Sequence, residues 1–574
     1  MLRTLVLIAL AILFSACGGA GGDSSTAPSS PPTGGQNPPP ATPPSDAIPS
    51  RSVQDIEDAA RFLVQASFGP TLEEIEWLNS NGFDAWFEQQ KNARISSHRA
   101  KTLAIFNADD DARQQGAEFP WNGHRHGAWI DIALNGEDQL RQRVAFALSQ
   151  LFVVSEKSQL EGEHPALAKY YDDLAAHAFG NYRELLEYVT LSPVMGAYLN
   201  MLGNEKPDAQ NNIRPDENYA REVMQLFSIG LQALNLDGSL KLQDGEPIPT
   251  YDLDDVKAYA HVFTGWHFDG TIADTWDQWW VNRNFNSQMR LVPEYHAIDE
   301  RKVLLGGVTV EPGTDGEEAM RLALDSLFNH DNVAPFVAKH LIQRLVTSNP
   351  SPAYIERVAA YFNDNGLGER GDLGAVVKAI LLDDEARQPI DTQDQYFGKV
   401  KEPLVRGMQM MRAFGLYQPA QAKAQWPEYS FNQAPLASPS VFNFFSPDFS
   451  PVGELSEAAI VSPEMEIIDD TFVVRLSNHA AWMSLWVPTP DEIDDGHHRD
   501  FTIDYTRFES MLSNDVNNYI DFMDLVLLSG SMSDEMRGIL LEYSEQAPDW
   551  VSDYEKVKEL TFLVTSSPQF AIQR

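Results

Sequence analysis

The sequence predicts a mainly α-helical protein, with one large multi-helix domain, long loops and at most a small β-hairpin. Three observations support this fold class. Apolar residues recur at helical spacing in many segments after residue 50. Thr71 and Glu74 form a capping pair, and Arg301 to Val310 gives the best strand signal. Of the 574 residues 43% are hydrophobic and 10% aromatic, so the chain can bury a substantial core.

Residues 1–17 have the pattern of an export signal. Arg3 precedes an apolar run from Leu5 to Phe14, which is too short for a comfortable membrane span. The run ends in a sequence similar to a bacterial lipobox, Leu13-Phe14-Ser15-Ala16-Cys17. Cys17 is the only cysteine, so it has no disulfide partner. We therefore expect a lipoprotein signal peptide whose Cys17 carries the lipid anchor.

Residues 18–50 are dominated by Gly, Ser, Thr and Pro, and they offer little that could form a core. Such a composition is typical of a disordered tether, and its prolines favour extended conformers. By the sorting rule of such lipoproteins, Gly18 after the cysteine implies the outer membrane or the cell surface. The protein would then face the periplasm or the exterior, with residues 51–574 as its folded domain.

The first part of the folded domain shows several helical patterns. Apolar residues recur from Ser52 to Ser67, and Thr71 with Glu74 predicts the start of the next helix. Further helices are expected at Phe83 to Gln90 and Asp138 to Phe152. In the last of these, Arg141 falls inside the apolar arc. A buried guanidinium needs hydrogen-bonded partners, so Arg141 either reaches an acidic face elsewhere or extends its charge to the edge of the core.

The segment from Arg214 to Asn235 predicts an amphipathic helix with a dense polar face. Pro215 suits the first turn, Asp216 or Asn218 can cap it, and Gly230 ends it. At about 100° per residue, one arc carries acids, Arg and amides, while the opposite arc is apolar. The polar arc consists of Glu217, Asn218, Arg221, Glu222, Gln225 and Ser228. We expect a helix from Asp216 to Ile229, and its acidic face is a possible partner for Arg141.

The rest of the chain continues the helical pattern around one strand-like segment. Arg301 to Val310 is the expected hairpin, and Pro439 to Pro447 is an aromatic, proline-bounded loop. Helices are predicted at Tyr182–Thr190, Asp252–Gly265, Gly316–Asn329, Val333–Val346, Pro352–Asn363, Leu373–Leu382, Asp469–Ser484 and Val557–Ser566.

The charge balance excludes one class of partner. Lys and Arg number 42 against 83 Asp and Glu, which gives a formal net charge of -41. Such a charge repels phosphate backbones, so we expect no nucleic acid partner. An acidic surface suits cationic ligands or divalent ions, but it also serves solubility alone, which we favour.

Two His-containing segments and one tryptophan cluster can each be interpreted as a functional site or as ordinary surface or packing residues. His124 to His126 and Asp494 to His498 offer metal ligands without a complete set at a diagnostic spacing, so we assign no metal and read both as solvated surface. The cluster of Trp276, Trp279 and Trp280 could stack on sugar rings, although packing under a long loop is the reading we favour. The sequence identifies no cofactor.

Several long motifs resemble the bacterial domain-of-unknown-function family 1800. They occur in the order of that family, over nearly all of Arg51 to Gln573. They are A-A-R-F-L-V-Q-A-S-F-G-P from Ala59, D-Q-L-R-Q-R-V-A-F-A-L-S-Q from Asp138, R-P-D-E-N-Y-A-R-E-V-M-Q-L-F-S-I-G from Arg214, F-T-G-W from Phe263 and S-P-S-V-F-N-F-F from Ser438.

The resemblance implies export and a partner more than it implies a reaction. Family members are often found in organisms that handle surface polymers, and they are often encoded beside a member of the exported family 1501, whose fold is thought to be similar to sulfatases and alkaline phosphatases. The chain departs from the family at two places. His296 and Asp299 stand where the family has an adjacent His-Asp pair, and Asn432-Gln433 stands where Gly-Gln is common.

Two hypotheses for the function stay open. The first is a tethered lipoprotein that binds, assembles or exports an extracellular polymer such as a polysaccharide, with a partner from family 1501. Its only membrane contact would be the lipid anchor. The second is a hydrolase acting on a polysaccharide or anionic ester. In that case Glu217 or Glu222 would be the general acid or base, Arg221 and Arg141 would hold an anionic group, and His296 would shuttle a proton. The same residues could instead form a structural clamp.

Overall fold

The computed structural model describes residues 51–574, apart from 279, 390–395, 418–421, 425 and 488–501. The chain divides into two units, Met1–Thr42 and Pro43–Arg574, and every described residue belongs to the second. The signal peptide, the lipidation of Cys17, the tether and the segment Asp494 to His498 lie outside the described residues.

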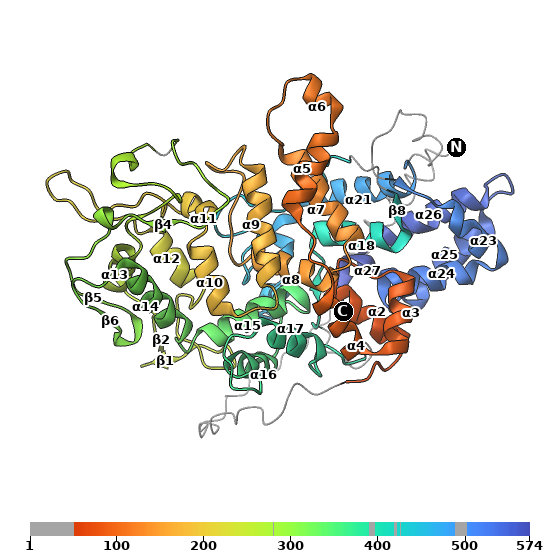
Figure 1. The fold of residues 1–574 in the computed structure, drawn as a ribbon. Coiled ribbons are helices and arrows are strands. Elements are labelled where there is room, and N and C mark those ends of the chain that lie inside the picture. The colour runs from red at the N-terminus through yellow and green to blue at the C-terminus, as the bar shows by residue number, and fades with distance from the viewer. Residues whose placement is uncertain (1–50, 279, 390–395, 418–421, 425, 488–501) are drawn as a thin grey trace. The chain divides into compact units, whose positions relative to one another are not determined.

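The described chain is mainly α-helical, as predicted (Figure 1). Its first part contains α2 (Ile56–Ala66), α3 (Leu72–Asn81), α4 (Phe83–Asn92), α5 (His98–Ala108), α6 (Asp110–Gln114), α7 (Asn122–Asn135), α8 (Gln139–Ser149), α9 (His164–His177), α10 (Tyr182–Thr190), α11 (Pro193–Tyr198) and α12 (Asn218–Gln225).

The second part continues with helices of similar length. They are α13 (Leu253–Val262), α14 (Gly316–Phe328), α15 (Val333–Leu345), α16 (Pro352–Asn363), α17 (Leu373–Leu382), α18 (Pro403–Phe414), α19 (Pro427–Phe431), α20 (Glu454–Glu457), α21 (Asp470–Ser484), α23 (Thr506–Asn514), α24 (Val516–Met523), α25 (Asp534–Gln546), α26 (Asp553–Thr565) and α27 (Pro568–Ala571).

Strands in the described residues form only two-stranded antiparallel pairs. The predicted hairpin is confirmed as β5 (Lys302–Val303) and β6 (Thr309–Val310). The other pairs are β1 (Leu242–Gln243) with β2 (Glu246–Pro247), β3 (Trp266–His267) with β4 (Arg290–Leu291), β7 (Lys399–Val400) with β10 (Ile572–Gln573), and β8 (Leu416–Tyr417) with β9 (Thr502–Ile503). The pairing of β10 with β7 ties the end of the chain to the start of α18.

One predicted helix start is confirmed by its capping contacts, and one predicted helix differs from the expected bounds. Thr71 Oγ1 accepts from the Glu74 backbone N–H at 3.2 Å, and Glu74 Oε2 accepts from the Thr71 N–H at 3.0 Å, so both halves of the capping box form. The predicted helix at Asp216 to Ile229 is shorter at both ends, because α12 begins at Asn218 and ends at Gln225. Beyond it the N–H groups of Phe227 and Ile229 bond five residues back, and Gly230 has φ 70°, so the chain leaves the helix.

The helix α8 lies in the middle of the described part and packs against α2, α4, α9 and α15 (Figure 1). Every residue from Gln139 to Ser149 is buried, including Arg141 and Arg143. Such burial on all sides places charged groups in the core, where they need partners. Among the described residues, no helix combines the length and the apolar content that crossing a bilayer requires.

Candidate functional site

The residues predicted to form one catalytic set lie in separate places. On α12, Arg221 Nη2 is 3.3 Å from Glu217 Oε2, with side chains 42% and 37% exposed. Asp216 caps the helix through the Asn218 N–H at 2.8 Å, as predicted. An exposed ion pair four residues apart contributes only about 0.3–0.5 kcal/mol. Glu217 and Arg221 are therefore surface groups open to solvent.

Glu222 is buried, although its helical position predicted the same polar face as Glu217. Its Oε2 atom has no hydrogen-bond partner among the described residues. Burial raises the pKa of Glu222, and the nearby charge of Arg221 opposes this only in part. Burial, and to a lesser degree the Glu222 charge, also raise the pKa of Tyr198 to about 12. Glu222 is thus the one member of the α12 set with the environment of a proton donor.

Arg141 is buried as its place in the apolar arc indicates, but its expected contact with the acids of α12 is wrong. Its guanidinium donates to the carbonyl oxygens of Ala175 at 3.1 Å and Lys91 at 3.5 Å, and it stacks over the Phe179 ring at 4.6 Å. Ala175 lies in the last turn of α9, and its carbonyl oxygen also accepts from the Ala178 backbone N–H at 3.3 Å. Arg141 therefore caps the end of α9 and is not part of a site with Glu222.

His296 lies in a third place, beside β3 and β4. Its Nδ1 atom is 2.9 Å from the Thr264 carbonyl oxygen, while Nε2 is buried without a partner among the described residues. Burial lowers its pKa, so the imidazole is neutral at pH 7. The charged groups that act on it are Lys302, Asp315 and Lys206, and neither Glu217 nor Glu222 is among them.

A surface groove is formed where α3 and α4 meet the turn between α7 and α8. Its volume is about 960 Å³, within the range of ligand sites in proteins. We call it the α3–α4 groove. The side chains along it that solvent can reach include Glu73, Trp77, Glu88, Asn92, Asn135 and Glu137.

The base of the α3–α4 groove is held by Arg412 of α18. This buried guanidinium donates to Gly69 O and Leu134 O, both at 2.6 Å, and to both oxygens of Glu74 at 2.6 and 2.8 Å. Both contacts with Glu74 come from Nη2, while Nε and Nη1 donate to the two carbonyl oxygens, so the carboxylate is held by a charge-assisted contact with one nitrogen. Arg412 therefore ties α3 to the end of α7, and its charge is already paired with Glu74.

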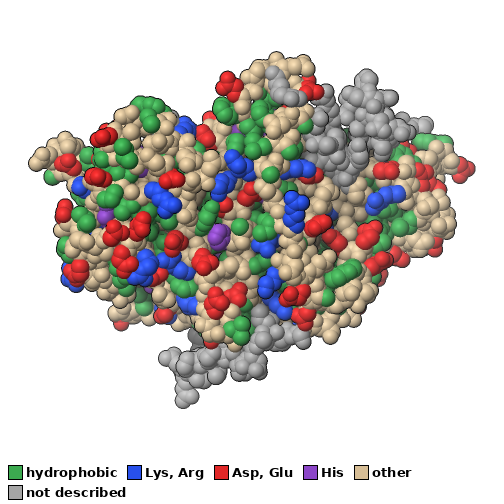
Figure 2. Space-filling model, viewed as in Figure 1, with side chains coloured by type: hydrophobic (Ala, Val, Ile, Leu, Met, Phe, Trp, Pro, Cys, Tyr) green, Lys and Arg blue, Asp and Glu red, His purple; other side chains and the backbone are tan. Residues whose placement is uncertain are grey.

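The α3–α4 groove combines an aromatic ring with carboxylates and amides. Trp77 is 38% exposed, whereas Trp86 beneath it is buried. Glu73, Glu88 and Glu137 leave the groove negatively charged, since the only lining cation is paired with Glu74. Asp and Glu side chains are also spread over the face that Figure 2 shows. Such a groove suits neutral or cationic ligands with an apolar ring face.

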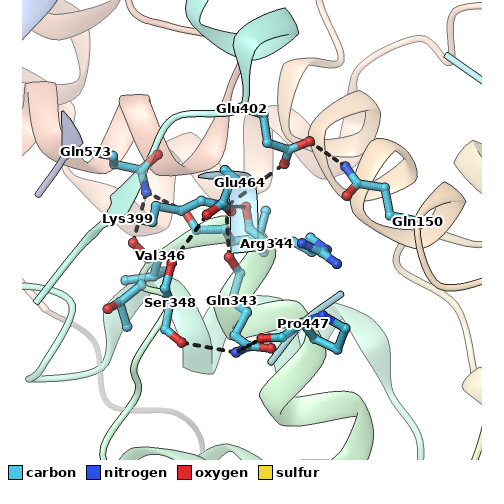
Figure 3. Close-up of polar contacts among 12 residues, drawn as sticks. Gln150, Gln343, Arg344, Val346, Ser348, Lys399, Glu402, Pro447, Glu464 and Gln573 are labelled. Atoms are coloured by element: carbon cyan, nitrogen blue, oxygen red, sulfur yellow. Dashed lines mark hydrogen bonds and ion pairs between the residues drawn. The ribbon is translucent and has the colours of Figure 1, made fainter. Parts of the chain in front are cut away.

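A second polar region is buried beside α8 and α15 (Figure 3). Lys399 Nζ lies 2.9 Å from Glu464 Oε1 and 3.9 Å from Glu402 Oε1. It also donates to the carbonyl oxygens of Gln343 at 2.8 Å and Arg344 at 3.1 Å. Two carbonyl oxygens thus accept from the ammonium group, and the Glu464 carboxylate adds a close opposite charge. We call the charged residues Arg143, Arg344, Lys399, Glu402 and Glu464 the buried network.

Segments from two of the family-like motifs meet at the buried network. Glu402 Oε2 accepts from Gln150 Nε2 at 2.8 Å and from Gln433 Nε2 at 2.6 Å (Figure 3 draws the first). Asn443 in turn donates to Gln150 at 3.1 Å. Asn432, where the family has Gly, adopts φ 52°, a conformation that Gly and Asn tolerate best. The aromatic loop thus closes over the end of α8.

The reading of His124 to His126 as solvated surface is wrong, because all three residues are buried. Arg125 donates to Glu156 at 2.5 Å, and His164 Nδ1 lies 3.7 Å from the same carboxylate. Burial and the charge of Arg125 lower the pKa of His126 to about 3. Within the described ranges, no group of three His, Cys, Asp or Glu side chains is placed to hold a metal ion.

The tryptophan cluster divides into packed and exposed rings. Trp276 is buried, stacks on Tyr295 with ring centroids 4.0 Å apart, and donates to Glu205 at 2.7 Å. This agrees with the packing role favoured from the sequence. Trp280 is 62% exposed, and Trp279 lies outside the described residues.

Sequence reasoning missed the α3–α4 groove and most of the buried network. The groove draws on residues from Thr71 to Arg412, which no local pattern connects. The sequence held one weak signal for the buried network. Three charged residues stand directly before Pro403, which begins α18; they are Lys399, Lys401 and Glu402.

Comparison with known proteins gives one match. The family model described as Protein of unknown function (DUF1800) matches residues 61–572. No curated protein and no solved structure matches the chain.

Proposed function

The chain belongs to the DUF1800 family, and we propose that it is a cell-envelope lipoprotein that binds an extracellular polymer, in the first place a polysaccharide. The observation that carries this proposal is the α3–α4 groove, with its exposed Trp77 between carboxylates and amides. Sugar rings have apolar faces for an indole and hydroxyl groups for carboxylates and amides. An open groove also admits a chain that continues at both ends.

The charge of the groove narrows the class of polymer. Three carboxylates without a paired cation disfavour sulfated or uronic acid chains, because like charges repel in a partly desolvated site. Neutral chains and chains with free amino groups are favoured instead. This class also fits a protein whose formal net charge is -41.

The predicted anchor and tether set where binding would take place. A flexible chain of the length of residues 18–50 spans roughly 30 Å on average. Lipidation at Cys17 would then hold the folded domain near an outer membrane surface, where exported polymers pass. For assembly or export we propose a partner protein from the exported family 1501, on the basis of the family resemblance.

Polymer retention by the purified folded domain tests the binding proposal. Trp77→Ala is expected to weaken retention on a neutral or amino polysaccharide by about two- to tenfold, since an aromatic stacking contact contributes about 0.5–1.5 kcal/mol. The matched control is Trp550→Ala, because Trp550 is 75% exposed and does not line the groove. Equal retention by both variants and the unmodified protein would refute a role for the groove.

A hydrolase acting on a polysaccharide or anionic ester is the second candidate, and Glu222 is the observation that favours it. Its buried carboxyl has an unpaired oxygen and a raised pKa, as a general acid requires. The test is product release from polymers retained by the protein. Glu222→Gln should abolish release while leaving retention intact if this candidate is right. If no polymer is cleaved by the unmodified protein, binding alone remains.

A further inference from the structure

Arg344 on α15 is a buried cation without a hydrogen-bonding partner. Only 2% of the residue is exposed, and no side-chain hydrogen bond joins its guanidinium to another described residue. Its Nε and Nη1 atoms are fully enclosed. In Figure 3 its side chain carries no dashed line, although the neighbouring Lys399 and Glu402 do. The Phe445 ring lies 4.5 Å away and offers only its π face.

Arg143 on α8 is likewise buried with side-chain N–H groups that have no acceptor among the described residues. The residue is 1% exposed, and its Nη2 atom donates to the Arg344 carbonyl oxygen at 2.7 Å. Its Nε and Nη1 atoms have no partner among the described residues. Two adjoining arginines therefore present four enclosed N–H nitrogens without acceptors. Leaving such groups dry and unpaired costs several kcal/mol, so an acceptor is needed.

The charges of the buried network do not cancel. Arg143, Arg344 and Lys399 are cations, and the carboxylates that act on them are Glu402 and Glu464. The charge of Arg344 also acts on His340, which is neutral because burial lowers its pKa to about 3. One positive charge is left without a counter-ion among these residues. Water could accept the free N–H groups, but it would not neutralise this charge.

We propose that Arg143 and Arg344 bind a small inorganic monoanion of the halide class, chloride being the abundant example. One negative charge balances the network, and a spherical ion can accept from both guanidinium groups at once. The enclosure of both side chains excludes larger anions such as a nucleotide or a sugar acid. Bound there, the ion joins α8 to α15 and supports the aromatic loop at Phe445.

Chloride-dependent unfolding tests this site. The protein is heated in sodium chloride and in sodium gluconate at the same ionic strength. The melting temperature should rise by about 2 °C when chloride exceeds its Kd roughly 100-fold, and should keep rising with the logarithm of the chloride concentration. Arg344→Met should lose this dependence. Arg406→Met, which removes a cation that donates to the Thr565 carbonyl oxygen and lies over the Phe570 ring, should keep it. Equal melting of the unmodified protein in both salts would overturn the proposal.

A bromide-soaked crystal gives a second measurement that needs no variant. An anomalous peak within hydrogen-bond distance of both guanidinium groups is expected. A site occupied only by water, without anomalous signal, would overturn the assignment. This result also decides the matter if Arg344→Met does not fold.

Discussion

The α3–α4 groove and the buried network are both rich in charge, yet water reaches only the first. In the groove, Glu73, Glu88 and Glu137 stay hydrated and need no protein partner. In the network, Lys399 contacts two carboxylates and two carbonyl oxygens, because an enclosed ammonium ion is costly without them. Charge in the core therefore serves the fold, while charge in the groove is free to serve a ligand.

The largest effect is expected from Lys399→Met in the buried network. The change removes the cation that lies 3.9 Å from Glu402 and 2.9 Å from Glu464, and leaves these enclosed carboxylates with the more distant charges of Arg143 and Arg344. This should lower the free energy of unfolding by about 3–5 kcal/mol. Urea denaturation measures this. Lys378→Met removes a cation from a solvated pair with Asp84 and should cost less than about 1 kcal/mol. If both variants lost similar amounts of unfolding free energy, buried and solvated charges would not differ in their contribution to stability.

Burial of His126 should make the free energy of unfolding depend on pH. The folded state takes up its proton only near pH 3, whereas the unfolded state does so near pH 6.5. The unfolded state therefore binds more protons in this window. As pH falls through it, the free energy of unfolding should drop by about 1.4 kcal/mol per unit. Denaturation of His126→Asn from pH 7 to 4 should show a shallower decline than the unmodified protein.

Burial of Glu222 should make the free energy of unfolding depend on pH more weakly and in the opposite direction. Burial raises its pKa in the folded state, so the folded state binds more protons than the unfolded state above the ordinary Glu value. Its contribution to stability is present at low pH and is lost as pH rises through the raised pKa. Glu222→Gln should therefore gain stability relative to the unmodified protein between pH 4 and 7. A gain that does not change with pH would mean that the carboxyl is solvated.

The smallest effect is expected from the exposed pair on α12. Arg221→Ala should change the free energy of unfolding by less than about 0.5 kcal/mol, because both side chains are hydrated. The effect should vanish in 1 M salt, where the screening length is about 3 Å. A loss above 2 kcal/mol would show that α12 carries a structural clamp after all.

The sequence predicts the fold well where local chemistry decides. The Thr71 and Glu74 capping box formed, and α10 and α16 have the predicted bounds. Prediction fails where burial is complete. The helix α7 is enclosed over most of its length, so its glycines and histidines show no amphipathic pattern.

The site was less predictable, because its contacts join distant parts of the chain. The apolar arc around Arg141 indicates burial, but its partners come from α4 and α9. Likewise Glu222 is buried, although its helical position predicted the same polar face as the partly exposed Glu217. The periodicity of apolar residues predicts which face of a helix is buried, but it does not predict which residues pack against that face.

Hydrogen exchange with bound polymer tests the central claim, that solvated charge in the groove serves a ligand. A polysaccharide retained by the unmodified protein is added at saturation, and amide protection is mapped along the chain. We expect added protection in α3, α4 and the turn from Leu134 to Glu137, with none in α12. Protection confined to α12, or no change at the groove despite binding, would contradict the account.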